Sequence, residues 1–155
     1  IAAAKYLAEQ PDIDAQRVGI WGWSFGGFMS SLCIMKGHDV FSTAIAIAPV
    51  TNWRYYDSIY TERYMRTPQE NEKGYDENSP MNYVGQLKGN LLLCHGTADD
   101  NVHVQNTYEL SERLVQANKQ FDMAIYTNRN HNINGGNTTL QLYSRFVKYL
   151  KERMQ

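Results

Sequence analysis

The sequence has 155 residues, which suits one ordinary domain and is long enough to bury a single core. Hydrophobic residues make up 43% and charged residues 20%, a balance typical of globular domains that excludes a disordered chain. Because the formal net charge is −1 and no basic run occurs, we expect no nucleic-acid partner and no membrane contact from this segment.

The chain shows no targeting or membrane-spanning segment. No stretch approaches the roughly 18 continuous apolar residues that a membrane-spanning helix needs. The first residues lack the basic region and cleavage pattern of a signal peptide. Cys33 and Cys94 lie inside apolar segments, so we expect buried free thiols, which leave the redox compartment open.

The first part of the chain alternates between helix-forming and apolar segments. Residues 2–8 are strong helix formers, and Pro11 ends that helix. Residues 18–22 form a short apolar run, typical of a buried strand. Residues 26–36 predict a helix, and residues 43–50 predict a second buried strand.

The same alternation returns after an irregular, tyrosine-rich segment at residues 51–83. Residues 91–95 and 122–126 predict two further strands, while residues 104–117 and 138–154 predict amphipathic helices. The apolar stripes expected to be buried are Tyr108, Leu110, Leu114, Val115 and Ala117 in the first of these helices, and Leu140, Leu142, Tyr143, Phe146, Val147 and Leu150 in the second.

This order of strands and helices predicts an α/β fold. Continuous apolar strands imply burial on both faces, as in a mostly parallel sheet flanked by helices. We expect no internal domain boundary. Ligands of such sheets gather at the carboxyl ends of the strands. The chemistry is therefore expected in the loops that follow Gly22, Val50, His95 and Tyr126.

A candidate nucleophile lies in the segment 22–27, which fits the G-x-S-x-G pattern between a predicted strand and a predicted helix. A serine in so sharp a turn projects its hydroxyl above the sheet, and only small neighbours let the backbone pack that closely. The start of the helix offers free N–H groups to a developing oxyanion, and Phe25 would supply one of them. The alternative is that Ser24 only caps the helix.

Serine is a weak nucleophile at neutral pH, so it needs a base that is oriented by an acid, in the chain order Ser, Asp or Glu, His. His131 follows the fourth predicted strand at the correct sheet edge and is the candidate base; alternatively, it caps the final helix. His38 falls on the wrong side of the sheet. His95 ends a strand before any later acid, and His103 lies where the next helix begins.

The candidate acid is one of two neighbours, Asp99 and Asp100, whose side chains cannot both face a histidine. Asp99 ends the turn that leaves the third strand. Asp100 is better placed to cap the following helix or its loop. Position favours Asp99 but leaves both residues open.

Residues 22–27, 48–65 and 95–103 closely resemble the dipeptidyl peptidase IV branch of the prolyl oligopeptidase family. The resemblance extends from end to end, and the middle segment is specific to that branch. It implies an α/β-hydrolase catalytic domain in which Ser24 is the nucleophile, Asp99 the orienting acid and His131 the base. The choice of Asp99 over Asp100 rests on this resemblance.

The same resemblance implies a pocket for the residue on the acyl side of the cut. An aromatic, dry slot favours the rigid proline ring, which fits cleavage after proline or alanine. Its lining would be Val50, Trp53, Tyr56, Tyr60 and Val102, joined by Phe25, with Asn101 bonding a substrate carbonyl. The alternative is that these aromatic residues form core. Tyrosines expected to serve packing or the surface are Tyr55, Tyr64 and Tyr75.

The resemblance also implies that residues 1–155 are the C-terminal part of the catalytic domain. Family members have earlier strands, a β-propeller that binds the substrate's amino terminus, and an upstream tyrosine in the oxyanion hole. We expect these to be absent here and the isolated chain to be poorly active, since losing one oxyanion donor costs about 10² to 10³ in rate. The strand at 18–22 would keep an open edge, so we expect a homo-oligomer.

The predicted function is a serine peptidase that removes N-terminal dipeptides ending in proline or alanine from peptide substrates. The alternatives are an acylaminoacyl peptidase or carboxylesterase of the same fold, and a non-catalytic binding module. No metal, phosphate-loop or dinucleotide motif occurs, so we expect catalysis without a cofactor. Family members are periplasmic, cytosolic or anchored outside the cell.

Overall fold

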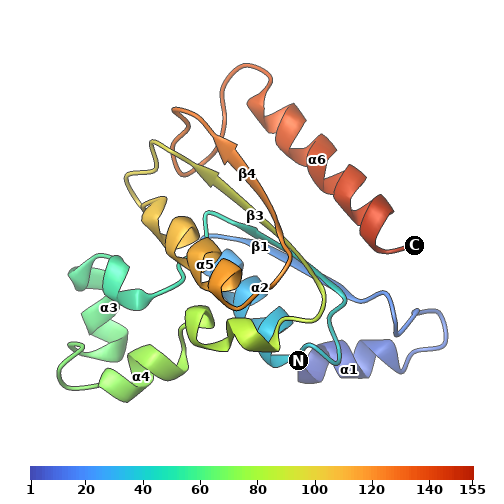
Figure 1. The fold of residues 1–155 in the computed structure, drawn as a ribbon, viewed down its shortest axis with the longest axis horizontal. Helices are drawn as coiled ribbons and strands as arrows, with labels where there is room; N and C mark the ends of the chain where they lie inside the picture. Colours follow the sequence, from blue (N-terminus) through green and yellow to red (C-terminus); the bar gives the residue numbers. More distant parts are fainter.

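The computed structural model describes residues 1–155 and contains one parallel sheet with helices on both faces (Figure 1). The strands are β1 (Gly19–Trp23), β2 (Thr43–Ile47), β3 (Asn90–Gly96) and β4 (Asp122–Tyr126). The α-helices are α1 (Ala2–Ala8), α2 (Phe25–Lys36), α3 (Ser58–Met65), α4 (Glu72–Glu77), α5 (Gln105–Gln116) and α6 (Thr138–Arg153). Two 3₁₀ helices are η1 (Trp53–Tyr55) and η2 (Pro80–Gln86). The predicted α/β fold is confirmed.

The sheet has the order β1-β2-β3-β4, and each neighbouring pair is parallel. All four strands therefore end at the same edge of the sheet, and β1 and β4 are the outer strands. Strand β2 ends at Ile47 rather than at the predicted Val50. The strand stops because Ala48 adopts a φ of 43° and Pro49 has no N–H to donate to a neighbouring strand.

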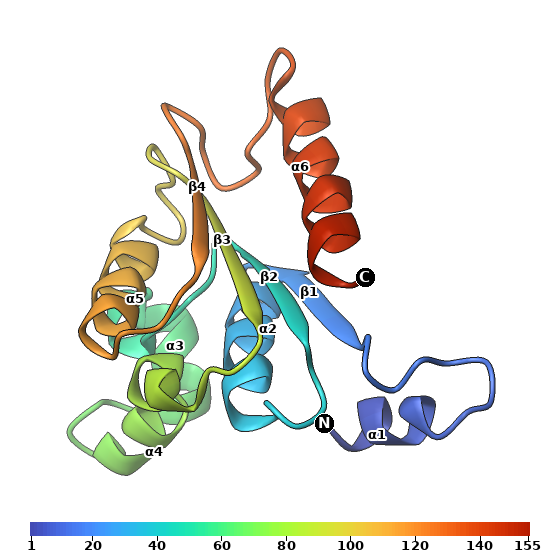
Figure 2. The same ribbon diagram turned by 45° about the vertical axis from the view of Figure 1, so that its right-hand side comes forward.

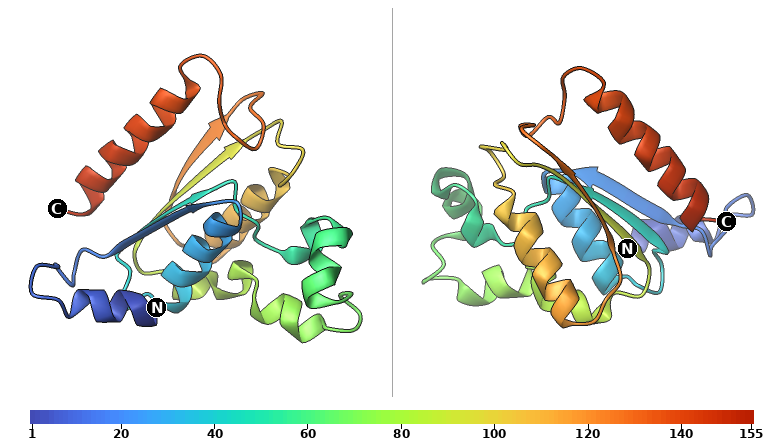
Figure 3. Two further views of the ribbon diagram at one scale, coloured as in Figure 1. Left: turned by 180° about the vertical axis from the view of Figure 1, so that it is seen from behind. Right: turned by 45° about the horizontal axis from the view of Figure 1, so that its top comes forward.

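Helices cover the two faces of the sheet unequally. Helix α6 lies alone on one face, whereas α2, α5 and η2 cover the other (Figures 2 and 3). Side chains from alternate positions of β2 and β3 reach the two layers, because successive strand residues point to opposite faces. The layer under α2 and α5 contains Ile34, Met35, Ala44, Ala46, Leu91, Leu93, Leu110 and Leu114. The layer under α6 contains Ile45, Ile47, Leu92, Cys94, Ala124, Leu142, Phe146 and Tyr149.

The two long helices at the C-terminal side bury narrower stripes than predicted. In α5, Tyr108 and Val115 are exposed, and the polar side chains of Asn106 and Thr107 are buried in their place. Helix α6 buries Leu142, Phe146 and Tyr149, whereas Leu140, Tyr143 and Val147 of the predicted stripe are exposed. The predicted stripes are therefore correct for the buried residues Leu110, Leu114, Leu142 and Phe146, and wrong for the exposed ones.

The segment between β2 and β3 leaves the sheet, as predicted for residues 51–83. It forms η1, α3, α4 and η2, and both α3 and α4 stand away from the sheet (Figure 1). None of the helices in the molecule combines the length and apolar character that a membrane crossing requires. Cys33 and Cys94 are free thiols, and burial raises the pKa of Cys94 to about 12.

Candidate active site

Ser24 occupies a strained turn between β1 and α2. Its φ of 59° and ψ of −116° lie outside the regions that residues other than glycine normally adopt. The turn is possible because the backbone packs very closely: a Cβ atom on Gly22 would lie 2.4 Å from the backbone of Gly26. A Cβ atom on Gly27 would lie 2.7 Å from the carbonyl oxygen of Ile47. The sheet and the helix therefore both require glycine at these positions.

Gly26 does not have the same role as its neighbours. A Cβ atom on Gly26 would meet no atom within 4 Å, so this position accepts a side chain on steric grounds. Close packing therefore requires glycine at Gly22 and Gly27 but not at Gly26.

Asp99 lies in the loop after β3 with its carboxylate fully buried. One oxygen, Oδ1, accepts hydrogen bonds from the backbone N–H groups of Asn101 (3.0 Å) and Val102 (2.9 Å). The other oxygen, Oδ2, faces the imidazole of His131. Asp100 is exposed and its side chain makes no hydrogen bond within the chain. The structure therefore distinguishes Asp99, which contacts a histidine, from Asp100, which does not. Position along the sequence left this choice open.

The pKa of Asp99 reflects two opposing effects. Burial acts to raise it, but hydrogen bonds from His131 and His95, together with the attraction of His131 and the N–H of Asn101, lower it well below its usual range. The carboxylate is therefore held in its ionised form, which can orient and stabilise an imidazolium.

His131 lies in the loop between β4 and α6. Its Nδ1 donates to Asp99 Oδ2 over 2.7 Å, which leaves Nε2 free of the proton and able to accept one. The indole Nε1–H of Trp23 donates to the backbone carbonyl oxygen of His131 over 2.8 Å. Because Trp23 directly precedes Ser24, this bond ties the histidine loop to the turn that carries the serine.

The structure joins two of the three candidate catalytic residues by a hydrogen bond, and the third follows a strand that ends at the same edge of the sheet. Asp99 and His131 are hydrogen-bonded, whereas the hydroxyl of Ser24 makes no hydrogen bond within the chain. Contacts between a nucleophile and its base are often long before substrate binds. The Trp23 bond nevertheless places the His131 loop next to the turn of Ser24.

His95 also contacts Asp99, although its position along the chain did not favour it as the base. It is completely buried at the end of β3, and its Nε2 lies 3.2 Å from Asp99 Oδ2 and 2.8 Å from the carbonyl oxygen of Val102. Its Nδ1 lies 2.7 Å from the hydroxyl of Thr107 in α5. A histidine inside an otherwise apolar strand, four residues before the acid, was the available signal.

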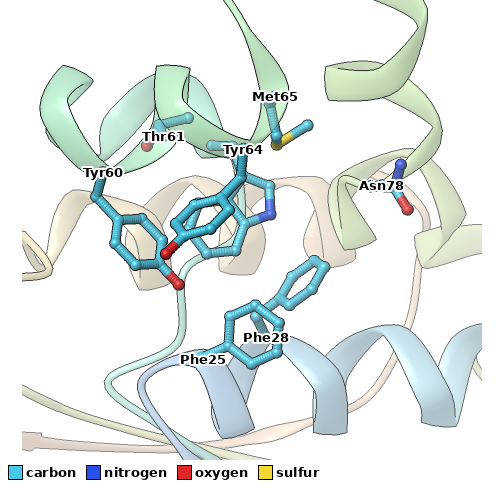
Figure 4. Close-up of a pocket in the computed structure, with 8 residues that line it drawn as sticks. Phe25, Phe28, Tyr60, Thr61, Tyr64, Met65 and Asn78 are labelled. Carbon is cyan, nitrogen blue, oxygen red and sulfur yellow. The ribbon is translucent and has the colours of Figure 1, made fainter.

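An aromatic cavity opens beside the serine turn. It has a volume of about 450 Å³, and Figure 4 shows Tyr60 and Tyr64 of α3 reaching toward Phe25 and Phe28 of α2. Its lining consists of Phe25, Phe28, Trp53, Tyr60, Thr61, Tyr64, Met65 and Asn78. The Trp53 and Tyr60 rings stack with centroids 6.1 Å apart, and Phe25 lies 5.8 Å from Trp53. Tyr64, expected to serve packing or the surface, is exposed and also lines this cavity.

The other predicted pocket residues do not line this cavity. Val50 and Val102 are buried in a hydrophobic cluster that also contains Trp53. Tyr56 donates its hydroxyl hydrogen bond to Asn101 Oδ1 over 2.7 Å, and both line a neighbouring depression. Burial, reinforced by the negative charge of Asp57, raises the pKa of Tyr56, so this hydroxyl keeps its proton.

The fold and this arrangement define an α/β-hydrolase: parallel strands whose carboxyl ends carry a strained serine turn and, at the same edge of the sheet, an aspartate–histidine pair with a buried carboxylate. No group of three histidine, cysteine, aspartate or glutamate side chains lies close enough together to hold a metal ion.

Comparison with known proteins assigns the chain to one family among the α/β-hydrolases. The sequence model of the prolyl oligopeptidase family matches residues 1–155, and the chain belongs to that family. It is 46% identical over 153 residues to a probable dipeptidyl-aminopeptidase B of Ajellomyces capsulatus, covering 97% of this chain and 17% of that protein. The corresponding protein of Emericella nidulans is 44% identical over 154 residues, again with 97% and 17% coverage.

The crystal structure of Porphyromonas gingivalis dipeptidyl peptidase 4 superposes with a TM-score of 0.96 at 53% identity, covering 98% of this chain and 22% of that chain. These relatives place the chain in the dipeptidyl peptidase IV branch of the family. The chain spans about a fifth of the length of these relatives.

Proposed function

We propose that this chain carries the catalytic residues of a serine peptidase that removes N-terminal dipeptides ending in proline or alanine. The observation that carries the proposal is the 2.7 Å hydrogen bond between Asp99 and His131 at the sheet edge where the strained Ser24 lies. The names of the similar proteins, dipeptidyl-aminopeptidase B and dipeptidyl peptidase 4, support the type of reaction.

In the proposed mechanism, Ser24 Oγ attacks the carbonyl carbon of the second substrate residue, and His131 Nε2 takes the hydroxyl proton. The C–N bond then breaks as His131 returns this proton to the leaving amine. Water hydrolyses the acyl-enzyme by the same route, with His131 again acting as base. Throughout, the ionised Asp99 keeps the Nδ1 proton of His131 oriented and stabilises the imidazolium.

The backbone N–H of Phe25 is the proposed oxyanion donor within this chain. It belongs to the first residue of α2, where N–H groups have no acceptor inside the helix. The positive end of the helix dipole favours the negative charge that develops on the carbonyl oxygen. The turn at Ser24 therefore presents nucleophile and oxyanion donor from adjacent residues.

The aromatic cavity is the proposed binding site for the second substrate residue. Trp53, Tyr60 and Phe25 form apolar walls, and a flat, rigid proline ring loses little entropy when it is held between them. Val50 and Val102 would help to hold Trp53 through the buried cluster that they share, and Tyr56 would hold Asn101 in place for a substrate carbonyl. Replacing Trp53 by alanine should therefore raise KM for a proline substrate more than it lowers kcat.

We further propose that residues 1–155 form the C-terminal part of the α/β-hydrolase catalytic domain of a longer peptidase. The coverage of 97% of this chain against 17% of a curated relative supports this view. The experiment is therefore designed for the full-length protein.

The test combines a substrate assay with active-site labelling. The full-length protein should cleave a Gly-Pro amide reporter and react with a fluorophosphonate, and Ser24→Ala should abolish labelling and lower kcat on the order of 10⁶-fold. Phe25→Tyr, which keeps the backbone N–H, should remain active. Cleavage of esters without Gly-Pro amides would identify an esterase instead. A properly folded protein that neither labels nor cleaves would be a binding module.

A further inference from the structure

The carboxylate of Asp99 has a second imidazole partner that the proposed mechanism does not use. His95 is completely buried and its Nε2 lies within reach of two oxygens, Asp99 Oδ2 at 3.2 Å and the carbonyl of Val102 at 2.8 Å. Neither oxygen has a proton to give. His95 must therefore carry a proton on Nε2 and donate it to both.

Thr107 fixes this arrangement from the other side of the ring. Its hydroxyl lies 2.7 Å from His95 Nδ1, and this is the only hydrogen bond that the fully buried hydroxyl makes. Because the two oxygens at Nε2 require the ring proton there, Nδ1 carries none and the Thr107 hydroxyl donates to it. Thr107 thus stabilises the His95 tautomer that points an N–H at Asp99 and holds the ring in its orientation.

The four donors around Asp99 come from three segments of the chain: the loop that carries Asp99, strand β3 and the loop of His131. Two are the backbone N–H groups of Asn101 and Val102 on Oδ1, and two are the imidazoles of His131 and His95 on Oδ2. His131 stands on a loop and is partly exposed, whereas His95 belongs to a central strand. Only His95 can hold Oδ2 from a fixed part of the sheet.

We propose that His95 and Thr107 are positioning residues that hold Oδ2 of Asp99 in the place where it orients His131. This inference rests on the proposed function, because it concerns the same aspartate–histidine pair. It adds a continuous chain of contacts, from Thr107 through His95 and Asp99 to His131, that links helix α5 to the base.

The first test replaces the second imidazole. In the full-length protein, His95→Phe keeps a ring of similar size but removes the N–H, and should lower kcat about 10- to 100-fold. Substrate binding should be little affected, with KM within about twofold of the wild type. Leu114→Ala, on the same helix as Thr107 and away from Asp99, is the control for destabilisation alone.

The second test keeps the ring and removes the hydrogen bond at its Nδ1. Thr107→Val keeps the shape of the side chain and removes the hydroxyl, and should lower kcat about 3- to 10-fold. Thr107→Ser restores a hydroxyl and should return kcat toward the wild-type value. The two Thr107 variants test the positioning role even if His95→Phe fails to fold.

A readout that needs no turnover separates this inference from the proposed function. The downfield proton resonance of the His131 Nδ1–H bonded to Asp99 should shift or broaden in His95→Phe and stay in Leu114→Ala. If kcat and this resonance respond to His95→Phe and Thr107→Val no more than to Leu114→Ala, the positioning role is wrong. If the wild type shows the resonance but cleaves no Gly-Pro amide, the proposed function fails while the positioning test still stands.

Discussion

The Asp99 carboxylate is subject to opposing influences from its surroundings. Burial alone favours the protonated form, but donors on both oxygens favour the charged form and prevail. The folded pKa therefore lies below the value of about 3.9 that an unfolded aspartate shows.

The difference between the folded and unfolded pKa of Asp99 predicts how the free energy of unfolding depends on pH. Below about pH 4 the unfolded chain binds a proton at Asp99 that the folded chain does not, so the free energy of unfolding falls as pH falls through that range toward the folded pKa. Asp99→Asn lacks the titrating group and should give a flatter curve. Denaturant titrations of both proteins between about pH 2 and pH 5 measure this.

The comparison isolates Asp99 from other acids. Asp14, Asp39 and Glu70 also have lowered pKa values, but they are retained in both proteins and their effects cancel in the difference. Parallel curves for wild type and Asp99→Asn would mean that the carboxylate gains nothing from its donors in the folded state.

At the scale of loops, Gly96 sets the distance between the two segments that carry Asp99 and His131. A Cβ atom there would lie 2.2 Å from the carbonyl oxygen of Arg129 and 2.8 Å from that of Asn130. The Ala98 N–H donates to the same Arg129 oxygen over 3.0 Å. The end of β3 and the histidine loop therefore touch backbone to backbone.

We predict that Gly96→Ala pushes the two loops apart and lowers kcat by more than 10-fold, on the order of the cost of a misplaced catalytic group. The matched control is Gly85→Ala in η2, where a Cβ atom would meet open space. The measurement is kcat for a Gly-Pro amide in the full-length protein, with the melting temperature of each variant. Equal activity of the two variants would contradict a role for this close approach.

The strands were predictable from sequence because each is a short apolar run with turn-forming residues nearby. Helix faces were predicted less well. The stripe predicted for α5 includes Leu110 and Leu114, which are buried, but also Tyr108 and Val115, which are exposed. The structure buries Asn106 and Thr107 instead. These polar side chains are inside because Asn106 Oδ1 accepts a hydrogen bond from the backbone N–H of Thr51 and the Thr107 hydroxyl bonds to His95 Nδ1. Periodicity of apolar residues cannot reveal a buried polar face.

The candidate site likewise contains residues that the sequence identifies and contacts that only the structure shows. Ser24 and His131 stand out by motif and by position along the chain, but the choice between Asp99 and its neighbour needs the direction of a side chain. The contact of His95 with Asp99 joins the end of a strand to the loop after it, and its orientation depends on Thr107 from a separate helix. Sequence order alone does not bring these three groups together.

On the scale of the whole molecule, the two edges of the sheet differ in chemistry. Strand β4 begins with Asp122, which pairs with Arg153 over 3.2 Å. Strand β1 contains glycine, isoleucine and tryptophan only, and Trp21 is 58% exposed with its ring 6.3 Å from that of Phe146. Charged residues on an edge strand discourage pairing with other chains, whereas an apolar edge favours it.

We therefore predict that the isolated 155-residue chain self-associates through β1. Trp21→Lys adds a charge to the exposed face of this strand and should shift the chain toward monomer, as measured by light scattering over a range of concentrations. Met123→Lys makes the same change on the exposed face of β4 and should leave the association intact. If the unmodified chain is a monomer at every concentration, or if both variants dissociate it equally, the open strand at β1 is not the site of association.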